Sequence, residues 1–196
     1  MVLLPNGHGL MQVRKREDRH IGGLSCIPER CGEMAKEKKS AKTNAVRLLE
    51  NEQVPYELMT YDVNDGQLDG VSVAAKTGQA AEAVYKTLVT ITSPKELFVF
   101  IIPVAEELDL KKAAKAVGVK KLEMLPLKDL TKETGYVRGG CSAVGMKKKY
   151  PTVIDVSAKN LEKMIVSAGK PGLQMKLAPE DLAKAADASF FDICKD

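Results

Sequence analysis

The chain has 196 residues, of which 44% are hydrophobic and 29% are charged, as is usual for a globular domain with its own core. Its net charge of +4 permits a phosphate or nucleic-acid partner without requiring one. The longest apolar run, residues 97–105, is far too short to cross a bilayer, so we expect no membrane segment.

Cysteine usage favours a reducing compartment. The four cysteines are too few for a disulfide framework in a chain of this length, and reduced thiols in the cytoplasm are the better interpretation. Cys26 and Cys31 also lack zinc-like spacing, and nothing near them completes a set of four ligands. We therefore expect no metal site and no cofactor.

Residues 1–41 differ in character from the rest of the chain. They mix charges, glycines and isolated apolar residues without a sustained period, which predicts a disordered tail. Alternatively, the segment depends on the choice of start site, because Met34 would begin an ordinary cytoplasmic N-terminus. Residues 42–196 are predicted to form a single domain.

The first half of this domain is expected to contain two helices and three strands. Thr43 can cap a helix that carries an apolar side, and residues 56–61 read as a strand. A short helix over residues 71–77 ends at Gly78. Two apolar strands, residues 84–91 and 97–104, are joined by a hairpin loop.

The second half continues with alternating elements. A helix over residues 109–117 has an aspartate cap and ends at a glycine, and residues 120–124 form a short strand. A helix over 127–133 follows a proline. The remaining elements are three strands and a helix that opens at a proline, at residues 152–156, 163–167, 173–177 and from 179. The pattern predicts an α+β domain without an internal repeat.

Lys86 interrupts the first of the two apolar strands. Strand period places it on one face with Val84 and Leu88. If that face is the inner one, the ammonium group points into a pocket, where it must find an anion, a dipole or a ligand. The alternative is the common one for lysine, a solvent-facing side chain whose stem covers its neighbours.

A glycine-rich segment, residues 134–145, is followed by three lysines at 147–149. Glycines allow positive φ and close approach of the backbone, so that successive amides can converge on an anion or a carbonyl oxygen. A plain turn beside a solvated charge run would have the same composition. The spacing from Gly140 to Gly145 resembles a P-loop, but Met146 stands where that loop needs lysine.

The absence of histidine after residue 20 restricts the chemistry. Only His8 and His20 occur, so residues 42–196 hold no imidazole to act as a general base. Cys141 and Ser142 have no evident activating partner. Any catalysis must therefore rest on positioning, backbone donors and a cation.

Six separated blocks together resemble a known family. They keep their order and spacing at residues 42–50, 84–88, 108–116, 134–145, 151–155 and 166–173. The chain from residue 42 to 196 resembles the YbaK/EbsC proteins, freestanding relatives of the editing domain of prolyl-tRNA synthetase. That resemblance implies an α+β fold with a mixed, β-barrel-like sheet flanked by helices.

The resemblance also implies an activity and partners. The expected reaction is hydrolysis of the ester of mischarged tRNA, either Cys-tRNA(Pro) or Cys-tRNA(Cys), with the 3′ end of the aminoacylated tRNA as ligand and prolyl-tRNA synthetase as a partner. For a cysteinyl substrate, its own thiol could attack the carbonyl, which would explain the missing protein base. The oligomeric state stays open.

By the same resemblance, Lys86 is the essential lysine and the glycine block holds the terminal nucleotide and aminoacyl group. The substrate-binding positions are Tyr61, Gly139, Gly140, Ser142, Gly145, Ser167 and Gly169, and we assign tRNA phosphates to Arg138, Lys147 and Lys148. Ala143 and Gln174 depart from the family pattern, which has proline and, in cysteine-specific relatives, an acidic residue there. These departures bear on cysteine selectivity more than on ester cleavage.

Two other functions fit the same fold. A non-catalytic tRNA- or synthetase-binding module would bind tRNA but leave the ester intact. A phosphate-ligand binding protein that used the glycine loop would retain nucleotide in the absence of tRNA.

Overall fold

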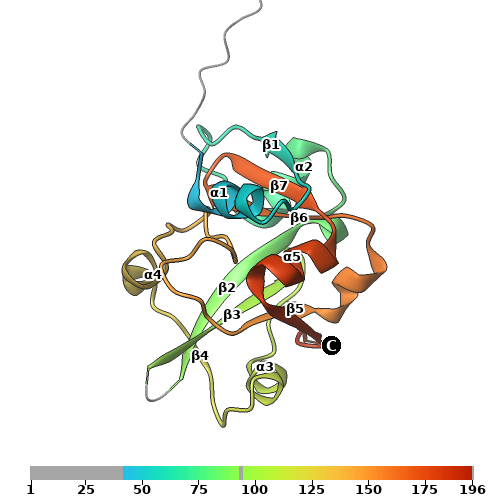
Figure 1. The fold of residues 1–196 in the computed structure, drawn as a ribbon. Coiled ribbons are helices and arrows are strands. Elements are labelled where there is room, and N and C mark those ends of the chain that lie inside the picture. Colours follow the sequence, from blue (N-terminus) through green and yellow to red (C-terminus); the bar gives the residue numbers. More distant parts are fainter. Residues whose placement is uncertain (1–41, 93–94, 196) are drawn as a thin grey trace, which may run out of the picture. The chain divides into compact units, whose positions relative to one another are not determined.

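The structure, a computed structural model, describes residues 42–92 and 95–195 and has the expected α+β composition (Figure 1). The predicted tail, residues 1–41, lies outside the described residues. The helices are α1 (Asn44–Asn51), α2 (Gly70–Thr77), α3 (Leu110–Ala116), α4 (Leu127–Thr134) and α5 (Pro179–Ala186). The strands are β1 (Glu57–Thr60), β2 (Tyr85–Thr92), β3 (Glu96–Pro103), β4 (Glu123–Met124), β5 (Thr152–Asp155), β6 (Met164–Lys170), β7 (Leu173–Leu177) and β8 (Ala188–Phe191).

The helix boundaries follow from local capping chemistry. The side chain of Thr43 accepts a hydrogen bond from the amide of Val46, and the side chain of Asp109 accepts from two amides of the first turn of α3. Gly78 ends α2 in the left-handed conformation, which costs glycine little because it has no Cβ. The predicted helices are thus confirmed, with boundaries displaced by only one or two residues.

The strands fall into two sheets among the described residues. One has five strands in the order β4-β2-β3-β5-β8, and the other has three in the order β1-β7-β6. A single parallel bridge between Val84 and Ile165 joins them near the start of β2. The α+β class is confirmed, whereas the barrel-like sheet is two sheets that meet at one bridge and do not close into a barrel.

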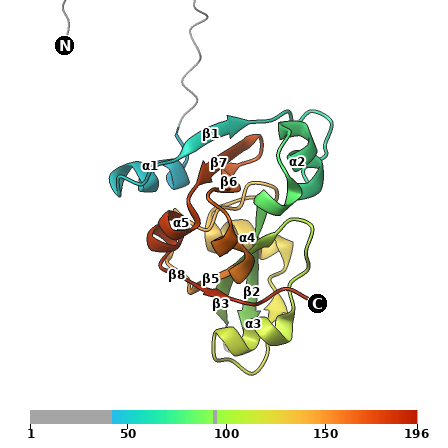
Figure 2. The same ribbon diagram turned by 90° about the vertical axis from the view of Figure 1, so that its right-hand side faces the viewer.

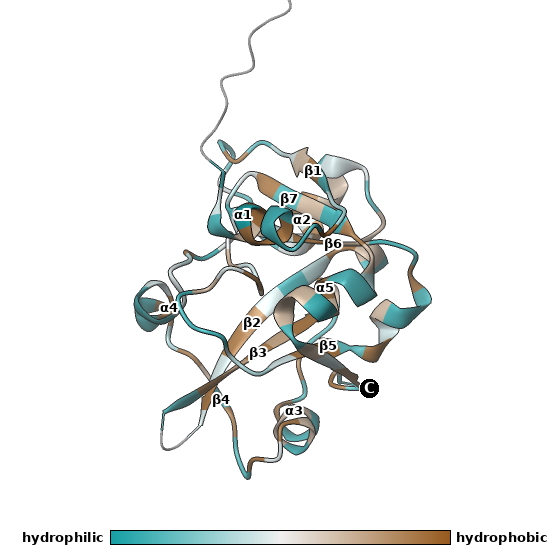
Figure 3. Ribbon diagram, viewed as in Figure 1, coloured by the Kyte–Doolittle hydropathy of each residue, from teal (hydrophilic) through white to brown (hydrophobic). Residues whose placement is uncertain are grey.

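Each face of the five-stranded sheet packs on its own hydrophobic cluster. Residues 97, 99 and 101 of β3 face a large core shared with α1, α5 and the three-stranded sheet. Residues 98, 100 and 102 face the opposite way and pack on α3. Figure 3 shows the hydrophobic colouring of β3 and the hydrophilic turns that the helices present outward. The sheet is therefore covered on both faces.

Two features were not predicted from the sequence. β8 follows α5 directly and pairs in parallel with β5, and two short 3₁₀ helices occur at Ala81–Ala83 and Val156–Asn160. None of the helices in the described ranges has the length and hydrophobicity of a bilayer span.

Candidate active site

Lys86 lies at the beginning of β2, close to the bridge between the two sheets. It pairs with Ile102 of β3, so its side chain leaves the sheet on the same face as α3. The residue is half-buried, and its Nζ donates a hydrogen bond to the carbonyl oxygen of Val104 at 3.0 Å. Among the described residues, no carboxylate forms an ion pair with this ammonium group, so its charge can act on a ligand.

A cavity of about 180 Å³ lies beside this lysine. We call it the Lys86 cavity; its lining includes Tyr61, Lys86, Thr87, Gly139, Ser167 and Gln174. Its walls come from the segment after β1, the first turns of α2, β2, the glycine block and the β6–β7 hairpin. The topology thus brings five of the predicted site residues to one place: Lys86, Tyr61, Arg138, Gly139 and Ser167.

Arg138 extends the positive charge outward from the Lys86 cavity. This exposed residue and Gly139 also line a neighbouring hollow of about 490 Å³, whose other wall is the loop of residues 66–69. The two hollows therefore share a border at the glycine block. A ligand whose small end fills the Lys86 cavity would extend past Arg138 towards solvent. The guanidinium of Arg138 could then bind an anionic group of the ligand next to that end.

Two buried oxygen atoms in the wall of the Lys86 cavity form no hydrogen bond with any described residue. They are Oε1 of Gln174, a residue only 6% exposed, and Oγ1 of Thr87. A buried polar atom without a partner costs free energy, which a ligand that donated a hydrogen bond to it would recover. Sequence reasoning missed Thr87, although its place directly after Lys86 in a strand could have indicated it.

The glycine block also offers backbone donors. The amide of Gly140 donates to the carbonyl oxygen of Val137 at 3.1 Å, but the amides of Gly139 and Cys141 form no hydrogen bond with described residues. Both of these residues line the Lys86 cavity. Their amides are therefore available to a carbonyl oxygen that develops negative charge.

The remaining glycines of the predicted site lie behind the cavity wall, where they allow close packing. A Cβ added to Gly140 would lie 2.7 Å from the backbone of Lys170, and one added to Gly145 would lie 2.7 Å from the backbone of α1. Gly169 has a φ of +97°, and a Cβ added there would lie 3.0 Å from the ring of Tyr136 and 3.2 Å from the Cβ of Thr43. These glycines let the backbone segments of the wall pack closely, but they do not line the cavity.

Ser142 and the two predicted phosphate-binding lysines lie away from the Lys86 cavity. Ser142 is fully buried, and its Oγ accepts from the amide of Val144. Lys147 donates to the carbonyl oxygens of Thr131 and Lys132 at the end of α4, where a cation complements the helix dipole. Lys147 and Lys148 line a separate hollow next to α1 and α5. The structure does not bring them to Lys86.

A strong protein nucleophile or base is missing from the wall of the Lys86 cavity. Burial raises the pKa of the Cys141 thiol to about 12, so the reactive thiolate is scarce at neutral pH. No histidine occurs among residues 42–92 and 95–195, and no cluster of potential metal ligands is found there. The cavity can orient a ligand and present amides and a cation to it.

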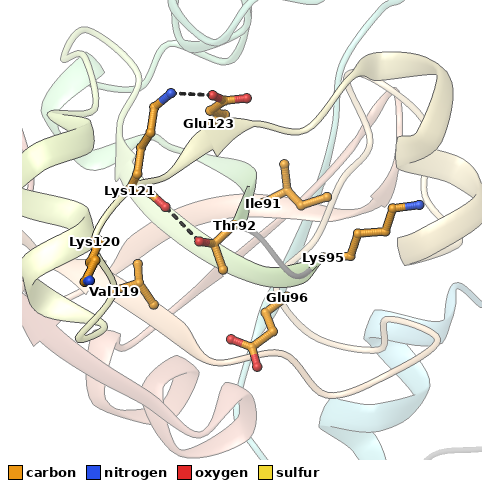
Figure 4. A pocket seen from close by; sticks show the side chains of 8 residues that line it. All are labelled: Ile91, Thr92, Lys95, Glu96, Val119, Lys120, Lys121 and Glu123. Carbon is orange, nitrogen blue, oxygen red and sulfur yellow. Dashed lines mark hydrogen bonds and ion pairs between the residues drawn. The ribbon is translucent and has the colours of Figure 1, made fainter.

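A larger hollow of about 720 Å³ lies at the far end of β2, between the β2–β3 hairpin and the segment before β4 (Figure 4). It contains none of the predicted site residues. Its lining of lysines and glutamates has no buried acceptor of the kind seen at Gln174, so it does not compete with the Lys86 cavity as a reaction site.

Comparison with known proteins agrees with this geometry. Residues 68–185 match the family described as the aminoacyl-tRNA editing domain. A protein of Enterococcus faecalis named as a Cys-tRNA(Pro)/Cys-tRNA(Cys) deacylase, EbsC, is 46% identical over 160 residues, which cover 82% of this chain and 98% of that protein.

Two solved structures share the fold. One, described as a trans-editing enzyme for prolyl-tRNA synthetase, has a TM-score of 0.69 at 20% identity and covers 80% of this chain and 100% of its own. Another, hypothetical protein APE2540, has a TM-score of 0.71 at 18% identity and covers 78% and 99%. The family match and the 46% identical relative place the chain in the aminoacyl-tRNA editing domain family.

Proposed function

We propose that this protein hydrolyses the ester bond between a wrong amino acid and tRNA, with Lys86 as the catalytic residue. The observation that carries the proposal is the composition of the Lys86 cavity: a cation that forms no ion pair with a described residue, two unpartnered acceptors and two unused amides all belong to residues that line it. A volume of about 180 Å³ suits an aminoacyl group and is small for a whole nucleotide.

The reaction needs little from the protein beyond positioning. An aminoacyl ester is already activated, and its hydrolysis passes through a tetrahedral intermediate with negative charge on the former carbonyl oxygen. The ammonium of Lys86 and the amides of Gly139 and Cys141 would stabilise that charge. Loss of one such donor typically costs about 3 kcal/mol in the transition state.

For a cysteinyl substrate, we propose that the thiol of the substrate is the nucleophile. Its sulfur attacks the carbonyl carbon, the bond to the ribose oxygen breaks, and the thiol proton passes to that oxygen. The resulting thiolactone is then hydrolysed by water. This route accounts for a cavity wall without histidine and with a cysteine of raised pKa.

The unpartnered acceptors support recognition of the α-ammonium group. Oε1 of Gln174 and Oγ1 of Thr87 are the buried oxygens that could accept its hydrogen bonds, and neither brings a negative charge into the cavity. The Enterococcus faecalis relative is named for Cys-tRNA(Pro) and Cys-tRNA(Cys), and we propose the same substrates here. Tyr61 and Ser167 complete the wall around the aminoacyl group.

We further propose that the reaction occurs in the cytoplasm, on tRNA released by or held on prolyl-tRNA synthetase. The domain of residues 42–196 carries the site, because every residue that lines the Lys86 cavity lies within it.

A single-turnover deacylation assay tests the function. Wild-type protein is expected to release cysteine from Cys-tRNA(Pro) much faster than buffer does, and to act far more slowly on a seryl ester, since serine lacks the thiol. Equal rates on both esters would rule out the thiol as nucleophile. Binding of tRNA with the ester left intact would favour the non-catalytic module instead.

Replacement of Lys86 tests the assignment of the catalytic residue. Lys86→Ala is expected to lower the single-turnover rate at saturating protein by about 100-fold or more, as for loss of an oxyanion donor. Lys128→Ala, on an exposed turn of α4, is the matched control and should keep the wild-type rate. A near wild-type rate in Lys86→Ala would show that the assignment is wrong.

A further inference from the structure

Positive charge is concentrated in one segment of an otherwise balanced chain. Residues 110–122 contain five lysines and no acidic residue. The charge of this segment, +5, exceeds the net charge of +4 for the entire chain. The segment comprises α3 and the loop that leads to β4. A local field of this kind attracts a polyanion even where the whole molecule is only mildly basic.

Four of these lysines are exposed and form a continuous surface, which we call the α3 lysine surface: Lys111, Lys115, Lys120 and Lys121. Lys120 and Lys121 line both the hollow of about 720 Å³ and another of about 620 Å³ that includes Lys111 and Lys115, so the two hollows adjoin. Figure 4 shows Lys120 and Lys121 on one side of the larger hollow and Lys95 on the other.

Most of this charge is not neutralised by the protein. Lys121 pairs with Glu123 at 2.7 Å (Figure 4), whereas Lys111, Lys115 and Lys120 form no ion pair with any described residue. Three uncompensated ammonium groups on one exposed surface repel one another. A ligand with regularly spaced negative charges would relieve that repulsion and release counterions.

The α3 lysine surface is connected to the Lys86 cavity by one row of side chains. Lys86, Leu88, Thr90 and Thr92 follow one another at every second position of β2, on the face that carries α3. Oγ1 of Thr92 donates to the carbonyl oxygen of Lys121 at 2.8 Å, which holds this end of the row beside the lysines. Thr92 is six positions after Lys86 along the strand, a span of about 20 Å. In Figures 1 and 2, α2 and α3 lie toward opposite ends of β2.

This separation fits an extended nucleic-acid strand that starts in the Lys86 cavity. A few nucleotides of single strand cover such a distance, and in a tRNA the paired acceptor stem then follows. We infer that the α3 lysine surface binds backbone phosphates of the acceptor arm while the aminoacylated 3′ end occupies the Lys86 cavity. The inference rests on the proposed function and goes beyond it by assigning phosphates to lysines outside the glycine block.

The test compares a triple variant with wild type on two substrates. Lys111→Ala, Lys115→Ala and Lys120→Ala together are expected to lower kcat/KM for full-length Cys-tRNA by roughly tenfold or more at moderate salt, through KM, because three phosphate contacts are lost. The rate on a 3′-cysteinyl-adenosine ester, which cannot reach the surface, should stay unchanged. An equal loss on both substrates would overturn the inference.

Binding of uncharged tRNA separates this inference from the proposed function. In a salt titration, the slope of log K against log salt should fall by about two to three for the triple variant. The control carries Lys128→Ala, Lys132→Ala and Lys184→Ala on α4 and α5, which removes the same charge elsewhere and should keep the wild-type slope.

The outcomes are distinct. If wild type binds tRNA through these lysines but hydrolyses no ester, the proposed function fails and the docking surface stands. If wild type hydrolyses the ester while the triple variant retains wild-type kcat/KM and salt slope on full-length tRNA, the docking surface is wrong.

Discussion

Cys141 illustrates how burial decides what a reactive residue type can do. Its side chain lies in the wall of the Lys86 cavity, beside amides that could stabilise an oxyanion, which is a position typical of a nucleophile. Burial, however, raises the pKa of its thiol to about 12, and no described base lies beside it. At neutral pH the thiol is protonated and poorly nucleophilic.

We therefore expect Cys141→Ser to retain deacylation. The serine hydroxyl is close in size and keeps the cavity wall, so the single-turnover rate on Cys-tRNA should remain near that of wild type. Trapping with a thiol reagent gives an independent check, because the native Cys141 should react far more slowly than it does in urea. A rate reduced to the level of Lys86→Ala would indicate that the protein thiol, and not the substrate thiol, is the nucleophile.

Gln174 lowers the stability of the free protein and, we propose, binds the aminoacyl group of the substrate. Its Oε1 is buried without a partner, which destabilises the free protein, and the residue lines a cavity that we assign to an aminoacyl group. Gln174→Met replaces the amide with an apolar side chain of similar length. We expect an unfolding free energy equal to or above that of wild type, and a kcat/KM on Cys-tRNA lowered about tenfold by loss of one hydrogen bond to a charged group.

Chemical denaturation and steady-state kinetics measure the two quantities on the same preparation. Val73→Ile, which alters the apolar part of the cavity wall, is the control for a simple change of volume. A Gln174→Met variant that is less stable and fully active would contradict the assignment of this side chain to the ligand.

Helices and strands could be predicted where the local sequence determines them. Thr43 and Asp109 cap their helices through side-chain contacts with the next few residues, and both helices begin where the sequence indicated. β8 could not be predicted, since only alternate residues of it are partly buried. It is stabilised by pairing with β5, whose residues precede their partners in β8 by 36 positions in the sequence. Tertiary pairing, and not propensity, determines that strand.

The carboxylate of Asp155 links several elements and has a testable role in stability. It is 4% exposed and lies at the end of β5; its oxygens accept from the hydroxyl and amide of Ser157 and from the amide of Ile193. Ser157 in turn bonds the hydroxyl of Tyr85, the neighbour of Lys86. Burial acts to raise the pKa of Asp155, but these hydrogen bonds outweigh burial and lower it.

Asp155→Ala is expected to lower the unfolding free energy by about 3 kcal/mol at pH 7, because it leaves buried donors without partners. A lowered pKa means that the carboxylate stabilises the fold above the pKa of the unfolded chain, about 3.9, and that this contribution is lost as pH falls through the folded pKa. Urea unfolding at pH 7 and near pH 3 should thus show the gap between variant and wild type shrinking in acid. A gap that stays constant would mean that the charge of Asp155 contributes nothing.

On the scale of the whole molecule, the sequence could indicate which residues matter but not which of them meet. The glycine block reads as one binding surface, yet only Arg138, Gly139 and Cys141 of the block line the cavity, while Gly140 and Gly145 pack against β6–β7 and α1. Their neighbours come from segments distant in sequence, so spacing alone could not separate lining glycines from packing ones. Lys86 likewise lies two residues after the bridge between Val84 and Ile165, a contact between distant segments that local sequence does not reveal.

The proposed site makes a definite prediction about the extent of chain that activity needs. All residues that line the Lys86 cavity lie between positions 61 and 174, and the core that supports them begins at α1. A chain that starts at Lys42 is therefore expected to keep the wild-type kcat/KM on Cys-tRNA and the wild-type unfolding free energy.

A chain that starts at Glu52 is the matched control, because it also lacks α1. Ala45, Val46 and Leu49 of α1 are almost completely buried, and burial of a valine and a leucine alone contributes about 3–6 kcal/mol. The backbone of α1 is also the surface on which Gly145 packs, so its loss would displace the glycine block from Lys86. Full activity of the Lys42 chain with loss of folding in the Glu52 chain would locate the boundary of the domain between these residues, whereas an inactive Lys42 chain would show that residues before position 42 take part in the reaction.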